Sequence, residues 1–576
     1  MKVRVFCGLV LIFSVWMFCS AAFANAPITF ADVKAKNGMV AAANELASKA
    51  GVEILKKGGN AVDAAIATAL ALNIVEPNAS GLGGGGFATL YLNTGETVCW
   101  DFREMAPKSA TKDLFSSEQS QKEKWSTWGG KASGVPGSPM GLFTILEKYG
   151  TLSFAEVMAP ALALAEEGFT VDPLLASMIQ DNFDKITAFN PDGTTYTPEG
   201  LPLEKGTLLK QPVLAKTFRL LAEKGPDAYY KGEIGEAVVR AVNKAGGNMT
   251  MEDLANYKIE KREPLKGTYH GFSIVAPPPA SSAGTHVIQI LNVLENFPVK
   301  EWGHNSELYL HHLSETSKMM FADRAKYMAD TAFANVPLAG LISKAYAQRL
   351  AEKIGETAAL EITAGDPTAF ATTPKTQHRY GPAGDHNQHV STTHFSVVDS
   401  KGNMVAWTWT INNFFGSGVF VPEYGFMLND EMDDFSTNAS SVNAPEPGKR
   451  PLSSMTPTLV ISPDGKPFIA VGSPGATRII LAVAQIIVNA VDFGMSMDEA
   501  IEAPRLFNAL SGGKAGPLLI EAGVDESIVE GLKKRGHNVE VREKGLYFGG
   551  AQGIMIKDGE IVGGADSRRN GVAVGY

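Results

Sequence analysis

Cysteine is scarce in this chain. Three occur among 576 residues, and two of them, Cys7 and Cys19, lie within the first twenty residues. If these two leave with an N-terminal leader, Cys99 is alone and no disulfide can form within the chain. Cys99 lies in the apolar run TVCWDF, which favours a buried strand residue over a reactive thiol.

Excess positive charge and metal-ligand spacing are also missing. The chain has 51 Lys and Arg against 61 Asp and Glu, a net charge of -10, which argues against a nucleic-acid partner. The glycines at 83–86 precede no Lys-Ser/Thr pair, so they form no phosphate loop. The pairs His311-His312 and His386/His389 lack a credible metal-ligand spacing, and we interpret them as structural or solvated. We therefore expect no metal and no cofactor.

Long apolar runs are confined to the N-terminus. Lys2 and Arg4 precede an apolar run at residues 5–17, and Ala22-Phe23-Ala24 supplies a small-x-small cleavage pattern. This predicts a signal peptide at residues 1–24 and a periplasmic or secreted protein. The alternative, a membrane anchor, would need a longer span. After signal removal we expect no membrane association.

The first two thirds of the chain read as mainly helical. A helix is expected at residues 43–57, and Asn60 suits the N-cap of the next one. Residues 141–257 are largely helical in pattern, and further helices are expected at 284–296 and 306–328. Strands are expected after the glycine-rich turn at 83–86.

The pattern changes at residues 365–391. Loop-forming residues dominate there and no apolar period is visible, so we predict a flexible linker. Strand alternation begins at once after it, at residues 393–398 and 404–410, joined by a five-residue loop at 399–403 that contains glycine.

A second hairpin follows, and a helix after it. Residues 458–461 and 468–471 alternate around Pro463-Asp464-Gly465. The helix expected at 477–491 is apolar on nearly all faces and must be buried. Strands followed by a buried helix indicate stacked layers of sheet and helix.

The register of the first hairpin places Thr392 opposite Thr410, with both hydroxyls on one face. The Thr392 hydroxyl could attack the carbonyl of Ser391, and water could then cleave the resulting ester. The freed α-amine, with an ordinary pKa of about 8, could serve as the base for its own hydroxyl. On the hairpin alone, an ordinary strand threonine is the simpler interpretation.

The segment SPGATR forms a strand-to-helix turn. The amides of Gly475 and Ala476 lie there, where the first amides of a helix are unpaired. Such amides can hold an oxyanion, although a plain tight turn is the simpler alternative.

Charged and hydroxyl side chains could bind the two ends of an amino acid. Glu431, Asp433 and Asp434 in LNDEMDDFS form a dense acidic patch that could hold a substrate ammonium, or could be a solvated loop. Ser453 and Ser454 in KRPLSSMTP could donate to a carboxylate, and Arg103 could pair with it in bidentate fashion. Each feature taken singly favours a structural role.

Taken together, the motifs resemble the γ-glutamyltranspeptidase (glutathione hydrolase) family of N-terminal-nucleophile hydrolases. The matching strings extend from about residue 80 to 480 in the family's order: SGLGGGGF, DFREMAP, GVPGS, PPPASSAG, FADRAKY, STTHFSVVD, TWTINNFFGSG, LNDEMDDFS, KRPLSSMTP and GSPGATRII.

The resemblance implies an α+β fold, a four-layer αββα sandwich built by two subunits cleaved from one precursor. The large subunit would span residues 25–391 and the small catalytic subunit residues 392–576, held together as a heterodimer. It implies Thr392 as nucleophile, cleavage between Ser391 and Thr392, and Thr410 as the partner that orients the nucleophile. It also implies Arg103, Ser453 and Ser454 for the α-carboxylate, Asn412, Glu431 and Asp434 for the α-amino group, and the amides of Gly475 and Ala476 for the oxyanion. Ala476 replaces a second glycine common in the family, and a backbone amide serves either way.

The function implied is cleavage of the γ-glutamyl amide of glutathione and related compounds through a γ-glutamyl-threonine ester. Water, an amino acid or a dipeptide would accept the group. A glutaryl-type (cephalosporin) acylase on the same scaffold is the first alternative, although Arg103 and Asp434 favour an amino-acid head. An inactive periplasmic binding protein is the second.

Overall fold

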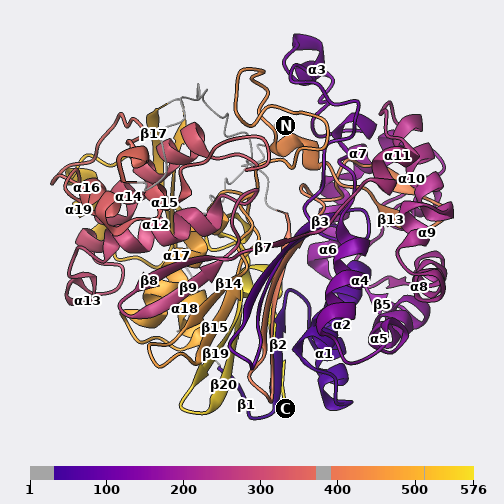
Figure 1. Ribbon diagram of the computed structural model, residues 1–576, viewed down its shortest axis with the longest axis horizontal. Coiled ribbons are helices and arrows are strands. Elements are labelled where there is room, and N and C mark those ends of the chain that lie inside the picture. The colour runs from indigo at the N-terminus through magenta and orange to yellow at the C-terminus, as the bar shows by residue number, and fades with distance from the viewer. Residues whose placement is uncertain (1–31, 371–390, 512) are drawn as a thin grey trace, which may run out of the picture. The chain divides into compact units, whose positions relative to one another are not determined.

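The computed structural model describes residues 32–370, 391–511 and 513–576 (Figure 1). The expected signal peptide at 1–24 and most of the expected linker at 365–391 lie outside these residues. Within the described part of the chain, no helix combines the length and the apolar character that a membrane crossing needs.

Two seven-stranded sheets form the centre of residues 32–576. The first sheet has the order β21 (Val572–Gly575), β2 (Gly38–Ala42), β10 (Thr393–Asp399), β11 (Met404–Thr410), β3 (Gly85–Tyr91), β4 (Thr97–Asp101) and β7 (Glu260–Arg262). The second has the order β1 (Val33–Ala35), β20 (Glu560–Ala565), β19 (Gln552–Lys557), β15 (Pro467–Gly472), β14 (Thr458–Ile461), β9 (Phe272–Ala276) and β8 (Leu265–Tyr269). Both sheets combine strands from before and after residue 391.

The alternation of β11 shows how the layers stack. Its residues Met404 and Ala406 belong to a thin apolar cluster that also holds Ala470 of β15, so they face the other sheet. The residues between and after them, Val405 and Trp407, pack instead with the helices on the outer face. Two buried faces on one strand require a covered sheet on both sides.

Helices cover both outer faces (Figure 1). The first sheet is covered by α1 (Glu45–Lys56), α2 (Ala61–Val75) and α4 (Ser138–Tyr149), with α5 (Phe154–Glu167) packed on α2. The second is covered by α12 (Ala283–Leu294), α17 (Arg478–Val491) and α18 (Met497–Glu502), with α14 (Glu307–Tyr327) packed on α12. The expected four-layer αββα sandwich is confirmed.

The remaining elements extend these layers. They include α3 (Glu118–Lys122), α6 (Pro173–Asp181), α7 (Phe183–Ala188), α8 (Pro212–Lys224), α9 (Asp227–Tyr230), α10 (Glu233–Lys244), α11 (Met251–Ala255), α13 (Val299–Trp302), α15 (Leu338–Leu341), α16 (Lys344–Ala351) and α19 (Glu526–Lys534). Strands β16 (Leu506–Ser511), β17 (Lys514–Glu521) and β18 (Val539–Arg542) form a small third sheet.

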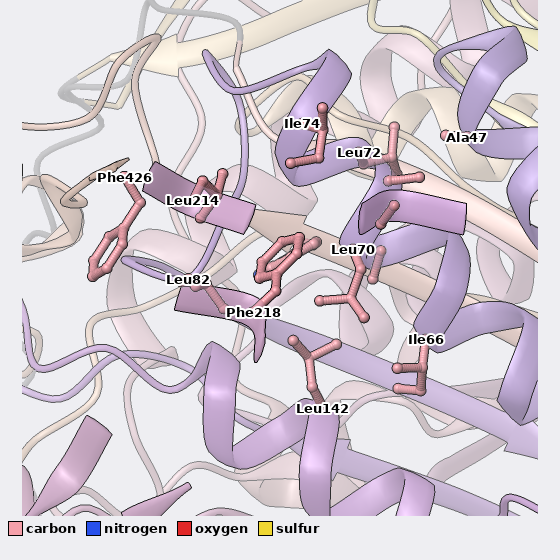
Figure 2. Close-up of a cluster of buried hydrophobic side chains, with 14 of the residues drawn as sticks. Ala47, Ile66, Leu70, Leu72, Ile74, Leu82, Leu142, Leu214, Phe218 and Phe426 are labelled. Carbon is pink, nitrogen blue, oxygen red and sulfur yellow. The ribbon is translucent and has the colours of Figure 1, made fainter. Parts of the chain in front are cut away.

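Helix α2 is the buried centre of the first helical layer. Figure 2 shows its Ile66 and Leu70 packed with Leu142 of α4 and Phe218 of α8. Every residue of α2 is buried, so it cannot rely on an exposed polar face. Asn60 caps it as expected, because its side chain accepts from the amides of the first turn.

The hairpin that carries the site has the expected register. Val398 pairs with Met404, and Thr393 pairs with Trp409, so Thr392 and Thr410 lie at its open end. The second hairpin, β14–β15, leads through the turn at 473–477 into the buried helix α17. Cys99 is buried in β4, as the sequence indicated.

Candidate active site

Thr392 and Thr410 meet at the end of the first sheet. Their hydroxyl oxygens lie 3.0 Å apart, and both side chains are buried. The Thr410 hydroxyl also accepts a hydrogen bond of 2.7 Å from the backbone amide of Asn412. Thr410 is therefore fixed from behind and presents its oxygen to Thr392.

The backbone at Thr392 is strained. Its φ is 79°, a left-handed value that a β-branched residue rarely adopts and that costs on the order of 1–3 kcal/mol. Ser391, on the other side of the expected scissile bond, is buried, and its hydroxyl has no partner among the described residues. The strained torsion is at Thr392 itself, directly after the peptide bond expected to break.

His394 lies two residues beyond Thr392, on the same face of β10. Its Nδ1 is 2.8 Å from the Thr408 hydroxyl and its Nε2 is 3.2 Å from that of Ser396. Burial lowers the pKa of His394 to about 3, so the ring is neutral at physiological pH. A Cβ on Gly472 of β15 would come within 2.4 Å of this ring. His394 thus spaces the two sheets beneath Thr392, a role that the i+2 spacing alone could have suggested.

The expected oxyanion turn lies between β15 and α17. Gly475 and Ala476 have φ values of 133° and 53°, and within the described residues no backbone carbonyl accepts from either amide. Both donors are therefore available to another acceptor.

Arg103 is 1% exposed and lies among carboxylates. It forms ion pairs with Glu431 and Asp434, and its Nη1 is 3.9 Å from Glu104. Arg103 and the two acids were expected to bind opposite ends of an amino acid, and here they are in direct contact with each other. Buried opposite charges pair because each would otherwise lose its hydration without replacement.

The carboxylates outnumber the guanidinium in this group. Burial raises the pKa of Glu104 to about 8, and it raises that of Glu431 well above its usual value, although Arg103 opposes both shifts. Burial therefore favours the protonated form of Glu104 at neutral pH. Adding a cationic group here would favour full ionisation.

The remaining expected residues lie along the same chain of contacts. The Asn412 side chain donates to the Asp430 carbonyl at 3.0 Å, directly beside Glu431. Arg103 Nε donates to the Pro451 carbonyl at 3.3 Å, two residues before Ser453. Hydrogen bonds, ion pairs and short stretches of chain thus connect Thr392 through Arg103 to the serine pair.

Ser453 and Ser454 are held by a segment that the sequence did not single out as functional. The Ser453 amide donates to the Ala280 carbonyl at 2.9 Å. The Ser454 hydroxyl accepts from Arg324 Nη2 at 3.1 Å, and Arg324 Nε donates to Ser282 at 3.0 Å. Arg324 belongs to the FADRAKY string, whose buried charge in a helix was the available signal.

One group among the described residues has metal-like proximity: His311, Glu315 and His537. His311 Nδ1 and His537 Nε2 already lie 2.8 Å apart, in hydrogen-bonding contact, and the Lys318 ammonium lies 2.5 Å from Glu315. The lysine supplies the positive charge that the carboxylate needs, so this group fits a metal poorly. His311 is structural rather than solvated.

Comparison with known proteins identifies the family. The family model described as Gamma-glutamyltranspeptidase matches residues 47–576. The glutathione hydrolase proenzyme of Escherichia coli (strain K12) is 40% identical over 94% of this chain and 92% of its own. The acylase ACY 1 proenzyme of Pseudomonas sp. (strain SE83) is 38% identical over 93% of each chain. The crystal structure of cephalosporin acylase from Bacillus halodurans superimposes with a TM-score of 0.85, at 29% identity, over 97% of this chain and 99% of that one. The chain belongs to the γ-glutamyltranspeptidase family.

Proposed function

We propose that this chain cleaves itself before Thr392 and then transfers or hydrolyses γ-glutamyl groups, with glutathione and related γ-glutamyl compounds as donors. The observation that carries the proposal is the 3.0 Å contact between the hydroxyls of Thr392 and Thr410, at a residue with a strained backbone torsion. It lies on the same chain of contacts as a buried Arg103 with an excess of carboxylates.

Self-cleavage begins with attack of the Thr392 hydroxyl on the Ser391 carbonyl carbon. The C–N bond breaks, the hydroxyl proton passes to the Thr392 nitrogen, and an ester replaces the amide. Water then cleaves the ester to give a carboxylate on Ser391 and a free hydroxyl and amine on Thr392. Thr410 orients the attacking oxygen, and relief of the positive φ favours the break.

The two products would be a large subunit of residues 25–391 and a small one of 392–576. Each central sheet contains strands from both segments. The subunits share their hydrogen-bonded sheets, so a stable heterodimer follows from cleavage.

In turnover, the freed α-amine accepts the proton of the Thr392 hydroxyl as the oxygen attacks the γ-carbonyl of the donor. The amides of Gly475 and Ala476 stabilise the negative oxygen of the tetrahedral intermediate. The leaving amine takes the proton, and a γ-glutamyl ester remains on Thr392. Water releases glutamate, or the amine of an amino acid or dipeptide takes the group.

The amino-acid head of the donor would be bound by exchange of ion pairs. Its α-carboxylate would replace the acids on Arg103, with help from Ser453 and Ser454. Its α-ammonium would form ion pairs with Glu431 and Asp434 and a hydrogen bond with Asn412. Two internal pairs are lost and two are formed, so no buried charge is left alone.

A glutaryl-type acylase is the second candidate, supported by the similarity to the cephalosporin acylase structure. A glutaryl group has a carboxylate but no amine. On binding it would occupy Arg103 and leave Glu431 and Asp434 without a cation, which is costly for buried groups. The excess of acids therefore favours the γ-glutamyl substrate. We also propose a periplasmic or secreted location, on the expected signal peptide.

A denaturing gel and two chromogenic substrates test the proposal. Wild type should give fragments of roughly 39 and 20 kDa, scaled by residue count, and Thr392→Ala should remain one band. Release from γ-glutamyl-p-nitroanilide should exceed that from glutaryl-p-nitroanilide, and glycylglycine should raise it if transfer occurs. An uncleaved wild type would overturn the proposed self-cleavage. A preference for the glutaryl compound would overturn the proposed γ-glutamyl specificity.

A further inference from the structure

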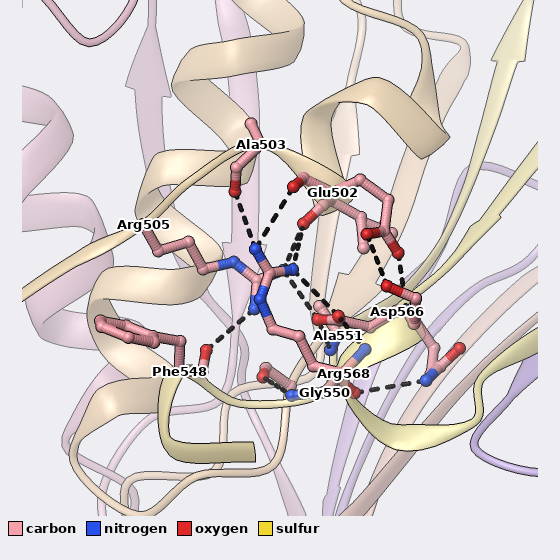
Figure 3. Close-up of polar contacts among 12 residues, drawn as sticks. Glu502, Ala503, Arg505, Phe548, Gly550, Ala551, Asp566 and Arg568 are labelled. Carbon is pink, nitrogen blue, oxygen red and sulfur yellow. Dashed lines mark hydrogen bonds and ion pairs between the residues drawn. The ribbon is translucent and has the colours of Figure 1, made fainter. Parts of the chain in front are cut away.

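Behind the oxyanion turn lies a second group of buried charges, which we call the support cluster (Figure 3). Its side chains are all nearly inaccessible to solvent, and they come from α18, the following loop, β17 and the segment after β20. The members are Glu502, Arg505, Glu521, Asp566 and Arg568. None of them touches the residues expected to bind substrate.

Asp566 is the centre of the support cluster. Its Oδ2 accepts from the Ala551 amide at 2.8 Å and lies 2.8 Å from Arg505 Nη2. Its Oδ1 accepts from the amide and from Nη1 of Arg568, both at 3.0 Å. Burial alone would raise the pKa of Asp566, but the two guanidiniums hold it below its usual value. Both oxygens are therefore fully used.

The support cluster forms hydrogen bonds with both ends of the loop at residues 548–551. Arg505 Nη1 donates to the Phe548 carbonyl at 2.8 Å, while Asp566 holds the Ala551 amide. In addition, the Asp566 amide donates to the Ala551 carbonyl at 3.0 Å. The loop between these anchors has little freedom to shift.

The loop at residues 548–551 is in direct contact with the oxyanion turn. The Gly550 amide donates to the Ser473 hydroxyl at 3.3 Å, and this hydroxyl donates to the Pro474 carbonyl at 2.7 Å. Gly549 has a φ of 98°, and a Cβ there would lie 2.6 Å from the Ser473 hydroxyl oxygen. The Cα of Gly549 lies 3.4 Å from the position of a Cβ on Gly475. The shape of the turn is thus set by direct contact with the loop.

We propose that Asp566, Arg505 and Arg568 are positioning residues that hold the Gly475 and Ala476 amides in the orientation needed for the oxyanion, acting through residues 548–551. This inference rests on the proposed function. Oxyanion donors must lie within a few tenths of an ångström of the developing charge to be effective. The route from Asp566 to those donors passes through Ala551, Gly550 and Ser473.

Asp566→Asn is the first test, because the amide keeps the size of the side chain and removes its charge. We expect kcat for γ-glutamyl-p-nitroanilide, per cleaved enzyme, to fall about 10- to 100-fold, as for partial loss of an oxyanion donor. KM should stay within about twofold, since the groups that bind the amino-acid head are untouched. Asp464→Asn, in the exposed turn of the β14–β15 hairpin, is the matched control and should be silent.

Gly549→Ala is the second test, and it perturbs the same route without changing any charge. A γ-phosphono analogue of glutamate, whose tetrahedral oxygens mimic the oxyanion, should bind about tenfold more weakly to both variants. Glutamate itself should bind as it does to wild type. Parallel weakening of both ligands, or unchanged kcat in both variants, would overturn the proposal. An inactive wild type would instead contradict the proposed function.

Discussion

Two buried ionic groups differ in their balance of charge. Around Arg103, one guanidinium faces Glu104, Glu431 and Asp434, and both oxygens of Glu104 lack hydrogen-bond partners among the described residues. In the support cluster, two arginines face three carboxylates, and Lys544, which lies outside the cluster, pairs with one of the three, Glu502. The oxygens of its Asp566 are all bonded.

This difference in charge balance suits the Arg103 group to binding a ligand and the support cluster to holding neighbouring backbone in place. An unbalanced group gains by accepting a ligand of the missing charge, whereas a balanced group only loses when it is disturbed. The Arg103 group is short of positive charge, and the α-ammonium of an amino acid supplies it. The support cluster lacks no charge of either sign, so it can hold the oxyanion turn in a fixed position. Substitutions around Arg103 should change activity most. Substitutions in the support cluster should lower stability and, through the oxyanion turn, lower kcat by a smaller factor.

Arg103→Gln should have the largest effect. The variant loses the bidentate partner of the donor carboxylate, and kcat/KM should fall by about 10³- to 10⁴-fold, equal to about 4–5.5 kcal/mol. Thermal stability should change little, because Glu104 and Glu431 can take up protons. Initial rates and thermal midpoints of both proteins check this. Arg103→Lys should recover only part of the rate, because an ammonium cannot bind in bidentate fashion. A rate within tenfold of wild type for Arg103→Gln would remove Arg103 from the site.

Arg568→Gln should lower stability, in addition to the loss of kcat expected for a positioning residue, whereas Arg103→Gln should lower activity alone. The loss of Arg568 leaves Glu521 and Asp566 short of their main partner, which should cost about 4 kcal/mol. For a protein of this size that corresponds to a drop of about 4 °C in the thermal midpoint. Differential scanning calorimetry is the measurement. An unchanged midpoint would mean that the support cluster is not balanced in the way described.

Asp434→Asn should change selectivity. The amide is a poorer partner for the α-ammonium, but it leaves the carboxylate side of the site intact. The ratio of kcat/KM for γ-glutamyl- over glutaryl-p-nitroanilide should fall about 30- to 100-fold, or about 2–3 kcal/mol. Asp433→Asn is the matched control, because Asp433 bonds to Ser126 and forms no ion pair with Arg103. An equal loss of kcat/KM on both substrates would show that Asp434 does not contribute to recognition of the α-amine.

The sequence predicted the layers, the hairpin register and the meeting of Thr392 with Thr410, because alternation and loop length are local properties. It also assembled the expected site by resemblance. It could not predict that Arg103 contacts Glu431 directly, since that pairing depends on folding segments more than 300 residues apart. The support cluster could not be predicted from the sequence for the same reason. No local pattern marks Asp566 and Arg568 as buried, because their partners Arg505 and Ala551 reach them only through the fold.

The pH dependence of stability should differ in sign between the two groups, with the smallest effect of those proposed here. The pKa of Glu104 is raised to about 8, so between about pH 5 and 8 the folded state binds a proton that the unfolded state lacks. Stability from this group therefore falls as pH rises through that window. Glu104→Gln should flatten the decline by on the order of 2 kcal/mol between pH 6 and 8, or about 2 °C in the thermal midpoint. Asp566 has a lowered pKa, so its contribution is present at neutral pH and is lost as pH falls below its ordinary range. Asp566→Asn should accordingly flatten only the acid side of the profile. If both variants flattened the same side, the two groups would not differ in charge balance, and the separation of binding from support would fail.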